Sequence, residues 1–523
     1  MNRAERRADR RARTRADRRS RAAALGSAAV LAGAASAAVL AVGGPAGANA
    51  PIVVDTLADS GAGSLRSAII QANTDAGADL IQFSVTGTIT LAFDLPAITD
   101  ELVVEGPGSS LLTIDGGWRY TGSGTGTGGA QILKWLFTTG HSGVSGVTLE
   151  GGNGFGGAVT TYGTTGTLSV DDVTFTGNAA AYAGAGVNVT YGPVDVTITD
   201  SHFVDNHAFY FGGAIHVEDG TLSISNTSFT DNVAYTKGGG AIWTSGDAVT
   251  TITGSTFSGN DGEEGGALYL QAGNTTIVDS TFTGNHSTWE GGAIHNVSGD
   301  LSISGSTFSG NASLYGGGAL YIDSGTVTIA DSTLTGNHAN THGGAIMGVP
   351  NGMTIISSTI TGNTAGVDGD GISLSFSWVS SAPPTPADGE LDLISTIVAG
   401  NGTHDISRDP TGSETVTSDH SLLGTVDAGI PVTDVGGTRT GVTAAELALG
   451  PLADNGGPTP TMLLLPGSVA IDAGPATLPT FTGSDYDQRG PGYPRVANGR
   501  VDVGAIEVQP PPPEPEPEPT FTG

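Results

Sequence analysis

The sequence predicts an all-β protein: a right-handed parallel β-helix with coils of about 26 residues and a cap at each end. Two motifs alternate along the chain: an apolar residue followed three positions later by Asn, and Gly-Gly-Ala followed by an apolar residue. A fixed period of this length is typical of a solenoid, in which each repeat buries its apolar face against its neighbours. Each period holds three short runs that alternate apolar and small polar residues, and 84 glycines disfavour helices, so three strands per coil, separated by turns, are expected.

The repeated asparagines mark the coils. Asn follows an apolar residue by three positions eight times, at spacings of 25 to 28 residues. We expect the apolar residue, usually Phe, to point inward and to stack on its counterpart in the next coil. We expect each Asn to lie at a turn, where its amide can bond turn backbone and neighbouring asparagines in a ladder. The predicted ladder consists of Asn178, Asn206, Asn232, Asn260, Asn285, Asn311, Asn337 and Asn363.

Residues 1–50 have the features of a secretory signal peptide. Ten Arg lie within residues 1–21, an Ala-rich apolar stretch covers residues 22–44, and the letters ANA follow as a cleavage-like site. A retained membrane anchor is the alternative, because the apolar stretch is just long enough to span a bilayer. The sequence therefore predicts an extracellular protein, secreted or attached to the cell surface, which meets the membrane only through this peptide during export.

Residues 51–118 are predicted to form the N-terminal cap and the first coils. The stretch "SLRSAIIQAN", which begins at Ser64, has the pattern of a short amphipathic helix that would cover the first coil. Its inward residues would be Leu65, Ala68, Ile69 and Ala72. The stretches "LIQFSV", "TITL", "LVVEG" and "LLTIDG" then show the alternation expected of strands.

The rest of the chain divides into three parts. Residues 119–400 are predicted to form the β-helix repeats, and residues 401–508 the last coils with a capping or anchor-type module. Residues 509–523 begin with "QPPPPEPEPEP", whose proline content predicts an extended polyproline tail.

Three stretches resemble known families. The alternation of F-x-x-N with G-G-A-[ILV] over residues 144–372 resembles the repeats of polymorphic outer-membrane proteins, which implies a β-helix linked to adhesion. "DSGAGSLRSAIIQAN" is similar to a capping segment named for its C-S-L-R-E-A motif, with Gly63 and Ser67 in place of the Cys and Glu. "DNGGPTPTMLLLPGSVAIDAG" resembles the choice-of-anchor module of bacterial β-helix surface proteins, which implies a C-terminal cap.

The charge balance limits the possible partners. Without residues 1–50, nine Lys or Arg and 48 Asp or Glu remain, so the net charge is near −39. Such a surface repels nucleic acid and anionic polysaccharides, and no nucleic-acid partner is expected. No Lys or Arg lies between Lys237 and Arg408, so an acidic sugar would find little to neutralise its carboxylates.

No catalytic residue is assigned from the sequence. A glycoside hydrolase needs two carboxylates across a groove, but Asp200, Asp231, Asp279 and Asp331 each fall close to a strand–turn boundary. They are more simply interpreted as turn residues that bond nearby backbone. The metal content is left unknown and no cofactor is predicted, although calcium is possible, with Asp485 and Asp487 as the candidate ligands.

An aromatic strip is the candidate binding site. The residue after the inward apolar position of each Gly-Gly-Ala motif should face solvent, because side chains alternate along a strand. These residues are His216, Trp243, Tyr269, His295, Tyr321 and Met347. A second aromatic group precedes the Gly-Gly turn: Tyr182, Tyr210, Tyr235, Trp289 and Tyr315. The strip could be a platform for sugar rings or a partner surface, or it could stabilise adjacent strands by stacking alone.

These features favour a secreted or cell-surface protein that is non-enzymatic and binds a glycan or a surface protein in adhesion. A carbohydrate-active enzyme, a polysaccharide hydrolase or lyase on the same fold, is the alternative from another class. A passive spacer in the cell wall is the third possibility.

Overall fold

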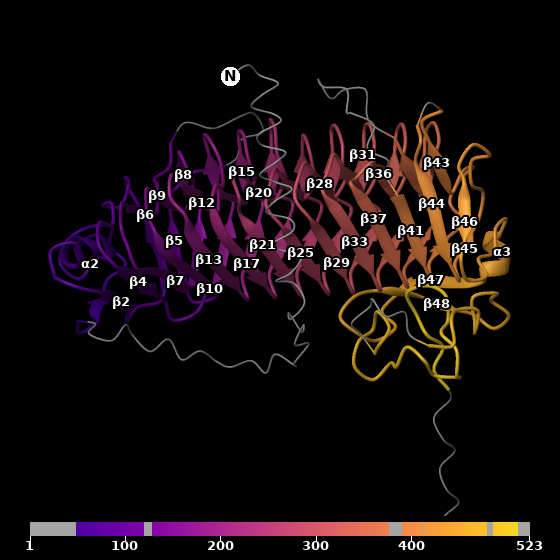
Figure 1. Ribbon diagram of the computed structural model, residues 1–523. Helices are drawn as coiled ribbons and strands as arrows, with labels where there is room; N and C mark the ends of the chain where they lie inside the picture. The colour runs from indigo at the N-terminus through magenta and orange to yellow at the C-terminus, as the bar shows by residue number, and fades with distance from the viewer. Residues whose placement is uncertain (1–48, 120–127, 376–389, 411, 478–484, 511–523) are drawn as a thin grey trace, which may run out of the picture. The chain divides into compact units, whose positions relative to one another are not determined.

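The computed structural model describes residues 49–119, 128–375, 390–410, 412–477 and 485–510. These residues form the predicted right-handed parallel β-helix, with about 13 turns and very little helix. Strands of successive coils lie side by side along the solenoid (Figure 1). Three parallel sheets run along it, named here sheets A, B and C.

Sheet A is the largest of the three and has 26 strands among the described residues. Its strands are β1 (Ile52–Val54), β2 (Asp79–Phe83), β3 (Gly87–Thr90), β4 (Leu102–Glu105), β5 (Leu112–Asp115), β7 (His141–Glu150), β10 (Gly166–Thr176), β13 (Val194–Thr199), β14 (His202–Val204), β17 (Gly220–Ser225), β18 (Ser228–Thr230), β21 (Val249–Thr253), β22 (Thr256–Ser258), β25 (Thr275–Val278), β26 (Thr281–Thr283), β29 (Leu301–Ser304), β30 (Thr307–Ser309), β33 (Thr326–Ala330), β34 (Thr333–Thr335), β37 (Gly352–Ile356), β38 (Thr359–Thr361), β41 (Glu390–Ile394), β42 (Ile397–Val398), β44 (Thr415–Asp419), β45 (Leu422–Leu423) and β46 (Val432–Asp434).

Sheets B and C consist of shorter strands. Sheet B contains β6 (Leu133–Leu136), β9 (Val159–Tyr162), β12 (Val187–Thr190), β16 (Ile215–Val217), β20 (Ile242–Thr244), β24 (Leu268–Leu270), β28 (Ile294–Asn296), β32 (Leu320–Ile322), β36 (Ile346–Gly348), β40 (Ile372–Leu374) and β43 (Ile406–Arg408). Sheet C contains β8 (Asn153–Gly154), β11 (Ala179–Ala180), β15 (His207–Ala208), β19 (Val233–Ala234), β23 (Asp261–Gly262), β27 (His286–Ser287), β31 (Ala312–Ser313), β35 (His338–Ala339) and β39 (Thr364–Ala365). The remaining elements are α2 (Leu65–Ala72), α3 (Ala444–Leu447) and the antiparallel pair β47 (Leu449–Ala453) and β48 (Thr461–Leu464).

One coil contains four strands rather than the three runs expected from the sequence. In the coil that begins with β17, the chain passes through β18, β19 and β20 before the next coil starts. Sheet A supplies two of the four, because Asn226 between β17 and β18 adopts a left-handed conformation with φ 50° and bends the chain. Asn tolerates this conformation better than most residues do.

The inward phenylalanines form a continuous stack, as predicted. The ring of Phe282 lies 4.6 Å from that of Phe257 and 4.7 Å from that of Phe308, and the planes are nearly parallel. All three side chains are fully buried. They belong to one apolar core that runs inside the coils from Ile52 to Ile430.

The repeated asparagines lie between sheets A and C and bond to one another from coil to coil. The Asn285 side-chain amide donates to Asn311 Oδ1 at 2.9 Å and to the Phe257 carbonyl at 3.0 Å. Its own Oδ1 accepts the backbone N–H and the side-chain amide of Asn260. The eight asparagines predicted from the sequence share this geometry, and the ladder continues to Asn401.

The first helix forms where the sequence predicts it. Helix α2 is capped by Ser64, whose side chain accepts a hydrogen bond from the Ser67 N–H at 3.2 Å. Its buried residues include the four predicted to point inward, and the helix packs against β1 and β2.

A C-terminal segment, residues 449–477 and 485–510, packs on the outer face of sheet A. Gln488 Nε2 donates to Thr307 Oγ1 at 2.8 Å, and Thr333 Oγ1 donates to Gln488 Oε1 at 2.6 Å. The buried Arg495 forms an ion pair with Asp331, which lies between β33 and β34. Polar contacts therefore hold this segment against a sheet face lined by threonines.

Several regions predicted from the sequence lie outside the described residues. They include most of the signal peptide of residues 1–50 and most of the tail of residues 509–523. Among the residues that the structure does describe, no helix is long and apolar enough to cross a membrane.

Asn285→Ala should lower the free energy of unfolding by about 1–3 kcal/mol, because it leaves buried backbone groups and two neighbouring amides without partners. Urea denaturation followed by circular dichroism measures the change. Asn351→Ala is the matched control, since Asn351 is exposed. Equal midpoints for the two variants would contradict a supporting role for the ladder.

The C-terminal segment should make the protein more stable at mildly acidic pH. Burial raises the pKa of Glu507 to about 7, although its carboxylate accepts hydrogen bonds from the Asp502 and Ala497 N–H groups. Burial likewise raises the pKa of Asp331 to about 6, and this effect outweighs the attraction of Arg495. The folded state thus holds protons that the unfolded chain has lost, so the free energy of unfolding should fall from about pH 5 to about pH 8.

Urea midpoints at the two pH values, compared between the wild type and Glu507→Gln, measure this effect. The variant carries no ionisable group at that position, so its midpoint should fall less between the two pH values. An identical pH dependence in both proteins would show that Glu507 does not titrate as described.

Candidate functional site

The six residues predicted to bind a ligand lie in one column on the outer face of sheet B. Backbone pairing aligns each with the next, from β16 to β36. The column consists of His216, Trp243, Tyr269, His295, Tyr321 and Met347. The structure therefore brings together all six side chains that alternation places on this face.

The expectation that this column faces solvent is wrong. Tyr269 is half-buried, and the other five side chains are at most 6% exposed. The loop that joins sheet C to sheet B in each coil (residues 209–214 in one coil), here the C-to-B loop, folds back over sheet B. The ring of Phe211 in this loop lies 3.8 Å from that of Trp243. Strand alternation identifies the outward face but does not reveal a loop that covers it.

Glycines allow the C-to-B loops to approach sheet B so closely. A Cβ atom on Gly238 would lie 2.3 Å from Cε3 of Trp243, and one on Gly316 would lie 2.0 Å from Sδ of Met347. Real Cβ atoms do not come this close to other heavy atoms. Part of the glycine content of these loops is therefore needed to cover the column.

The covered column forms a small second core outside the coils. The rings of Trp243 and Tyr269 lie 4.6 Å apart, and those of His295 and Tyr321 lie 4.9 Å apart at an edge-to-face angle of 89°. Such contacts between adjacent strands stabilise a sheet. The geometry fits the alternative interpretation of the strip, in which stacking holds neighbouring coils together.

An ion pair lies within this second core. His295 Nε2 is 3.0 Å from Asp323 Oδ2. Burial lowers the pKa of His295, but the hydrogen bond that it donates to Asp323 and the charges of Asp323, Glu290 and Glu264 raise it above its usual value. Burial and Glu264 also raise the pKa of the Tyr269 hydroxyl, which therefore stays neutral. The Asp323 carboxylate therefore has His295 as its partner inside the fold.

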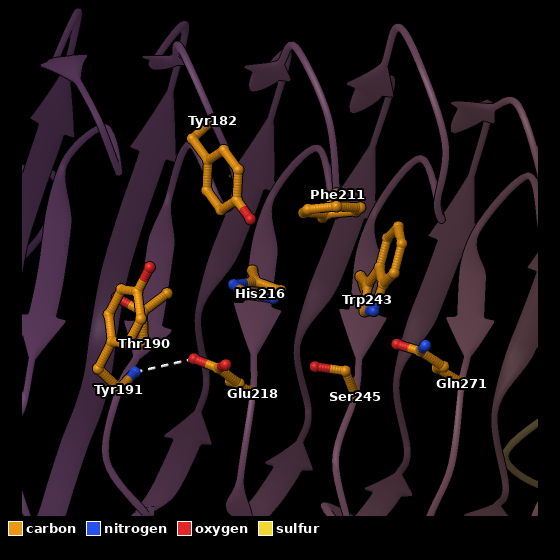
Figure 2. Close-up of a pocket in the computed structure, with 9 residues that line it drawn as sticks. All are labelled: Tyr182, Thr190, Tyr191, Phe211, His216, Glu218, Trp243, Ser245 and Gln271. Carbon is orange, nitrogen blue, oxygen red and sulfur yellow. Dashed lines mark hydrogen bonds between the residues drawn. The ribbon is translucent and has the colours of Figure 1, made fainter.

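A cavity of about 120 Å³ opens at one place along the column, at the coils of β12, β16, β20 and β24 (Figure 2). His216 and Trp243 line it from sheet B, and Tyr182 and Phe211 line it from C-to-B loops. Tyr191 and Glu218 stand at the ends of the sheet B strands. Thr190, Ser245 and Gln271 complete the lining. We call this cavity the aromatic pocket.

Polar side chains make up much of the lining of the aromatic pocket. Nε1 of Trp243 is buried and has no hydrogen-bond partner among the residues that the structure describes. Glu218 Oε2 accepts the backbone N–H of Tyr191 at 2.8 Å. Burial lowers the pKa of His216 to about 4, so its imidazole is neutral at neutral pH, with Nδ1 3.0 Å from Asn188 Oδ1. The lining therefore combines one carboxylate, a neutral imidazole, the amide of Gln271 and four hydroxyl groups with the buried N–H of Trp243.

Tyr191 is the most unusual residue of the pocket. Its side chain is 62% exposed, and its backbone is left-handed with φ 58°. The equivalent position in the preceding coil is Gly163, with φ 62°, and in the following coil it is Asp219. A non-glycine residue in a left-handed conformation costs about 1–2 kcal/mol. Tyr191 therefore adopts, at a cost, a conformation that Gly163 adopts without strain.

This lining suits binding better than catalysis. The pocket residues include one carboxylate and no Lys or Arg, whereas glycoside hydrolysis needs two carboxylates. Abstraction of a proton from an acidic sugar would also need a positive group to hold the sugar carboxylate. The pocket presents aromatic faces together with hydroxyl, amide and imidazole groups, and such a mixture can orient a bound ligand.

The other predicted sites have different environments. The four aspartates interpreted as turn residues all have left-handed backbone, with φ between 46° and 54°. Calcium binding at Asp485 and Asp487 stays a prediction; the carboxylate of Asp487 already pairs with Arg489 Nη2 at 2.6 Å. Within the described ranges, no group of three or more His, Asp or Glu side chains is arranged to hold a metal ion.

Sequence reasoning identified only part of the pocket. It proposed His216 and Trp243 in the strip and Tyr182 in the second aromatic group, but it missed Phe211, Tyr191 and Glu218. The signal for Tyr191 was available, because an aromatic residue stands where the preceding coil has Gly163. Phe211 carries no such signal, since its position depends on how the loop folds.

Comparisons with known proteins agree with the fold. The family model described as "Right handed beta helix region" matches residues 136–288 and 209–360. No curated protein matches. Two solved structures are similar in fold: an arginine-to-alanine mutant of the PL6 family alginate lyase AlyGC and a mannuronic acid specific family 6 lyase from human gut microbiota.

The likeness to both lyases is distant. For AlyGC the identity is 13% and the TM-score 0.39, with 89% of this chain and 60% of the lyase covered, so this chain spans well under the whole length of that enzyme. For the gut lyase the identity is 9% and the TM-score 0.30, with 66% of this chain and 91% of the lyase covered. With both TM-scores below 0.5, neither likeness carries an argument about this chain.

Tyr321→Ala should lower the free energy of unfolding by about 3–5 kcal/mol, because it empties a fully buried position between sheet B and the loops above it. Tyr315→Ala, in the C-to-B loop of the same coil, should cost less than about 1 kcal/mol, since Tyr315 is 39% exposed. Chemical denaturation of both variants compares the two positions. Similar losses at both would contradict the second core.

Proposed function

We propose that this protein is secreted or attached to the cell surface and binds a neutral glycan in the aromatic pocket without changing it chemically. The observation that carries the proposal is the buried, unpartnered Nε1–H of Trp243 at a cavity bordered by aromatic rings. A buried donor without a partner is costly, and a ligand that accepts its hydrogen bond would remove that cost.

The lining indicates the class of ligand. Aromatic side chains bind the apolar faces of sugar rings and leave hydroxyl groups free for hydrogen bonds. Glu218 can accept a hydrogen bond from a sugar hydroxyl through the oxygen that Tyr191 does not occupy. A sugar carboxylate would be repelled by Glu218 and by the net charge of the chain, so a neutral sugar fits best.

The secretion of this protein, or its attachment to the cell surface, is proposed from the signal-peptide pattern of residues 1–50. A binding role in adhesion needs a protein outside the cell, and residues 1–50 have the pattern of an export signal. The acidic surface supports a glycan or protein partner over nucleic acid.

Trp243→Phe keeps an aromatic ring, smaller than the indole, but removes the N–H, so it should weaken glycan binding by about 2- to 10-fold, the value of one neutral hydrogen bond. Tyr191→Gly should weaken it by a similar factor through loss of one ring face, while the fold tolerates glycine at this left-handed position. A neutral glycan array followed by titration calorimetry measures both. Tyr315→Ala, an exposed tyrosine outside the pocket, is the control.

The same samples separate the three classes of function. Release of reducing ends from any array glycan that binds would favour a carbohydrate-active enzyme. Absence of binding to every neutral glycan would favour a passive spacer and contradict the proposal.

A further inference from the structure

We infer that the aromatic pocket receives the terminal sugar unit of a neutral glycan, so that the protein binds the end of a glycan chain and not its interior. This inference rests on the proposed function and names the part of the glycan that is bound. It follows from the size of the cavity, from the covered column on both sides of it and from the position of its exposed lining residues.

The cavity has room for one six-membered ring. Its volume is about 120 Å³, and an apolar cavity of about 150 Å³ in another protein holds one molecule of benzene. Pockets that enclose a whole small-molecule ligand are larger, at about 300–1,000 Å³. One sugar unit therefore fits inside, whereas a stretch of several units does not.

The sheet B column is covered on the coils before the pocket. Asn188 precedes His216 in this column, Thr160 precedes Asn188, and both Asn188 and Thr160 are buried. Gly156 of a C-to-B loop lies directly on both side chains, since a Cβ atom there would be 2.3 Å from Thr160 Oγ1 and 2.7 Å from Asn188 Cβ. Loop and sheet are already in contact here, so a sugar chain has no path along the column in this direction.

The column is also filled on the coils after the pocket. The ring of Tyr269 lies 4.6 Å from that of Trp243 and 5.1 Å from that of His295. His295 is 4% exposed, and Tyr321 beyond it is fully buried. Covered residues therefore bound the pocket in both directions along the solenoid axis, and a ligand must enter from the side.

The exposed lining residues mark the mouth of the pocket. His216 and Trp243 are buried and form its floor. The lining residues that directly follow sheet B strands are half-buried or exposed: Tyr191, Glu218, Ser245 and Gln271. In Figure 2 these four lie in one row, opposite Tyr182 and Phe211. The linkage to the rest of the glycan would leave the pocket between this row and the C-to-B loops.

Tyr191 forms a preorganised edge of this mouth. Its ring lies 4.8 Å from that of Tyr162 on the preceding coil, and Phe137 packs edge-to-face on Tyr162 at 5.7 Å. Phe137 is 70% exposed and has left-handed backbone with φ 54°, the same combination as in Tyr191. The two rings outside the pocket hold Tyr191 in place, so less side-chain freedom is lost when a sugar binds.

The floor of the pocket favours a free hydroxyl group. Asn188 Oδ1 can only accept, so its 3.0 Å contact places the proton of the neutral His216 imidazole on Nδ1 and makes Nε2 an acceptor. Trp243 Nε1–H is a donor in the same floor. A hydroxyl can accept from Trp243 and also donate, whereas the ether oxygen of a linkage only accepts. The terminal unit keeps a free hydroxyl where an interior unit carries such a linkage.

Titration calorimetry with the full chain tests the inference. The ligands are the free monosaccharide, its methyl glycoside and its linear hexasaccharide, each for glucose, xylose, mannose and galactose. For the sugar that binds, the hexasaccharide and the tighter of the two monosaccharide forms should have dissociation constants within about 3-fold of each other, because a single ring makes the contacts. Tight binding of the methyl glycoside identifies the non-reducing end, and tight binding of the free sugar alone identifies the reducing end.

Phe137→Gly is the matched variant, since its left-handed backbone accepts glycine. Phe137 lies outside the pocket lining, so this ratio of dissociation constants should stay the same in the variant. A change in the ratio would place sugar units along the row of rings and overturn the inference.

The remaining outcomes separate the two proposals. A hexasaccharide that binds about 10-fold or more tightly than both monosaccharide forms overturns the chain-end inference and leaves the proposed function standing. Binding of a monosaccharide without binding of its hexasaccharide overturns it as well, because the linkage then cannot pass through the mouth. If no form of any sugar binds, the proposed function fails and this inference fails with it.

Discussion

The hydrogen-bonded asparagine ladder is the interaction on which the rest of this solenoid depends. Each rung bonds the next Asn in the ladder and the carbonyl of the residue three positions before the preceding rung, as Asn285 does with Asn311 and Phe257. A buried turn without such partners would leave backbone groups unsatisfied in every coil. Because the ladder fixes one residue of each coil against the next, it also fixes the register of the Phe stack and of the sheet B column.

Because the register is fixed, residues at equivalent positions of successive coils line up in columns on the outer faces of the sheets. The columns on sheet A and on sheet B are covered in different ways. On sheet A the columns of threonine receive the C-terminal segment through Gln488 and Arg495. On sheet B the column is covered by loops whose glycines permit close approach, and His216 and Trp243 stay buried even beside the aromatic pocket. The pocket therefore lies beside a covered column, and the sheet itself continues unchanged beneath it.

The fold could be predicted from the sequence because its two motifs recur at a nearly constant spacing. The spacing of the asparagines predicted the coil length, the inward phenylalanines and the ladder, and alternation predicted the outward face of Trp243 and Tyr321. Exposure could not be predicted in the same way, since it depends on loops of irregular length. Phe211 covers Trp243 through a tertiary contact that no spacing encodes.

The positions that depart from the repeat carry the functional argument. Tyr191 and Phe137 adopt a left-handed conformation that Gly163 adopts between them at no cost, and both expose most of their rings. Covered residues such as Tyr321 pack between sheet B and the loops above it, whereas these two rings lie mostly exposed. In the proposed function, aromatic faces, one carboxylate and a neutral imidazole meet a neutral sugar at the pocket. Such a ligand would bind those faces without requiring any charge to be compensated.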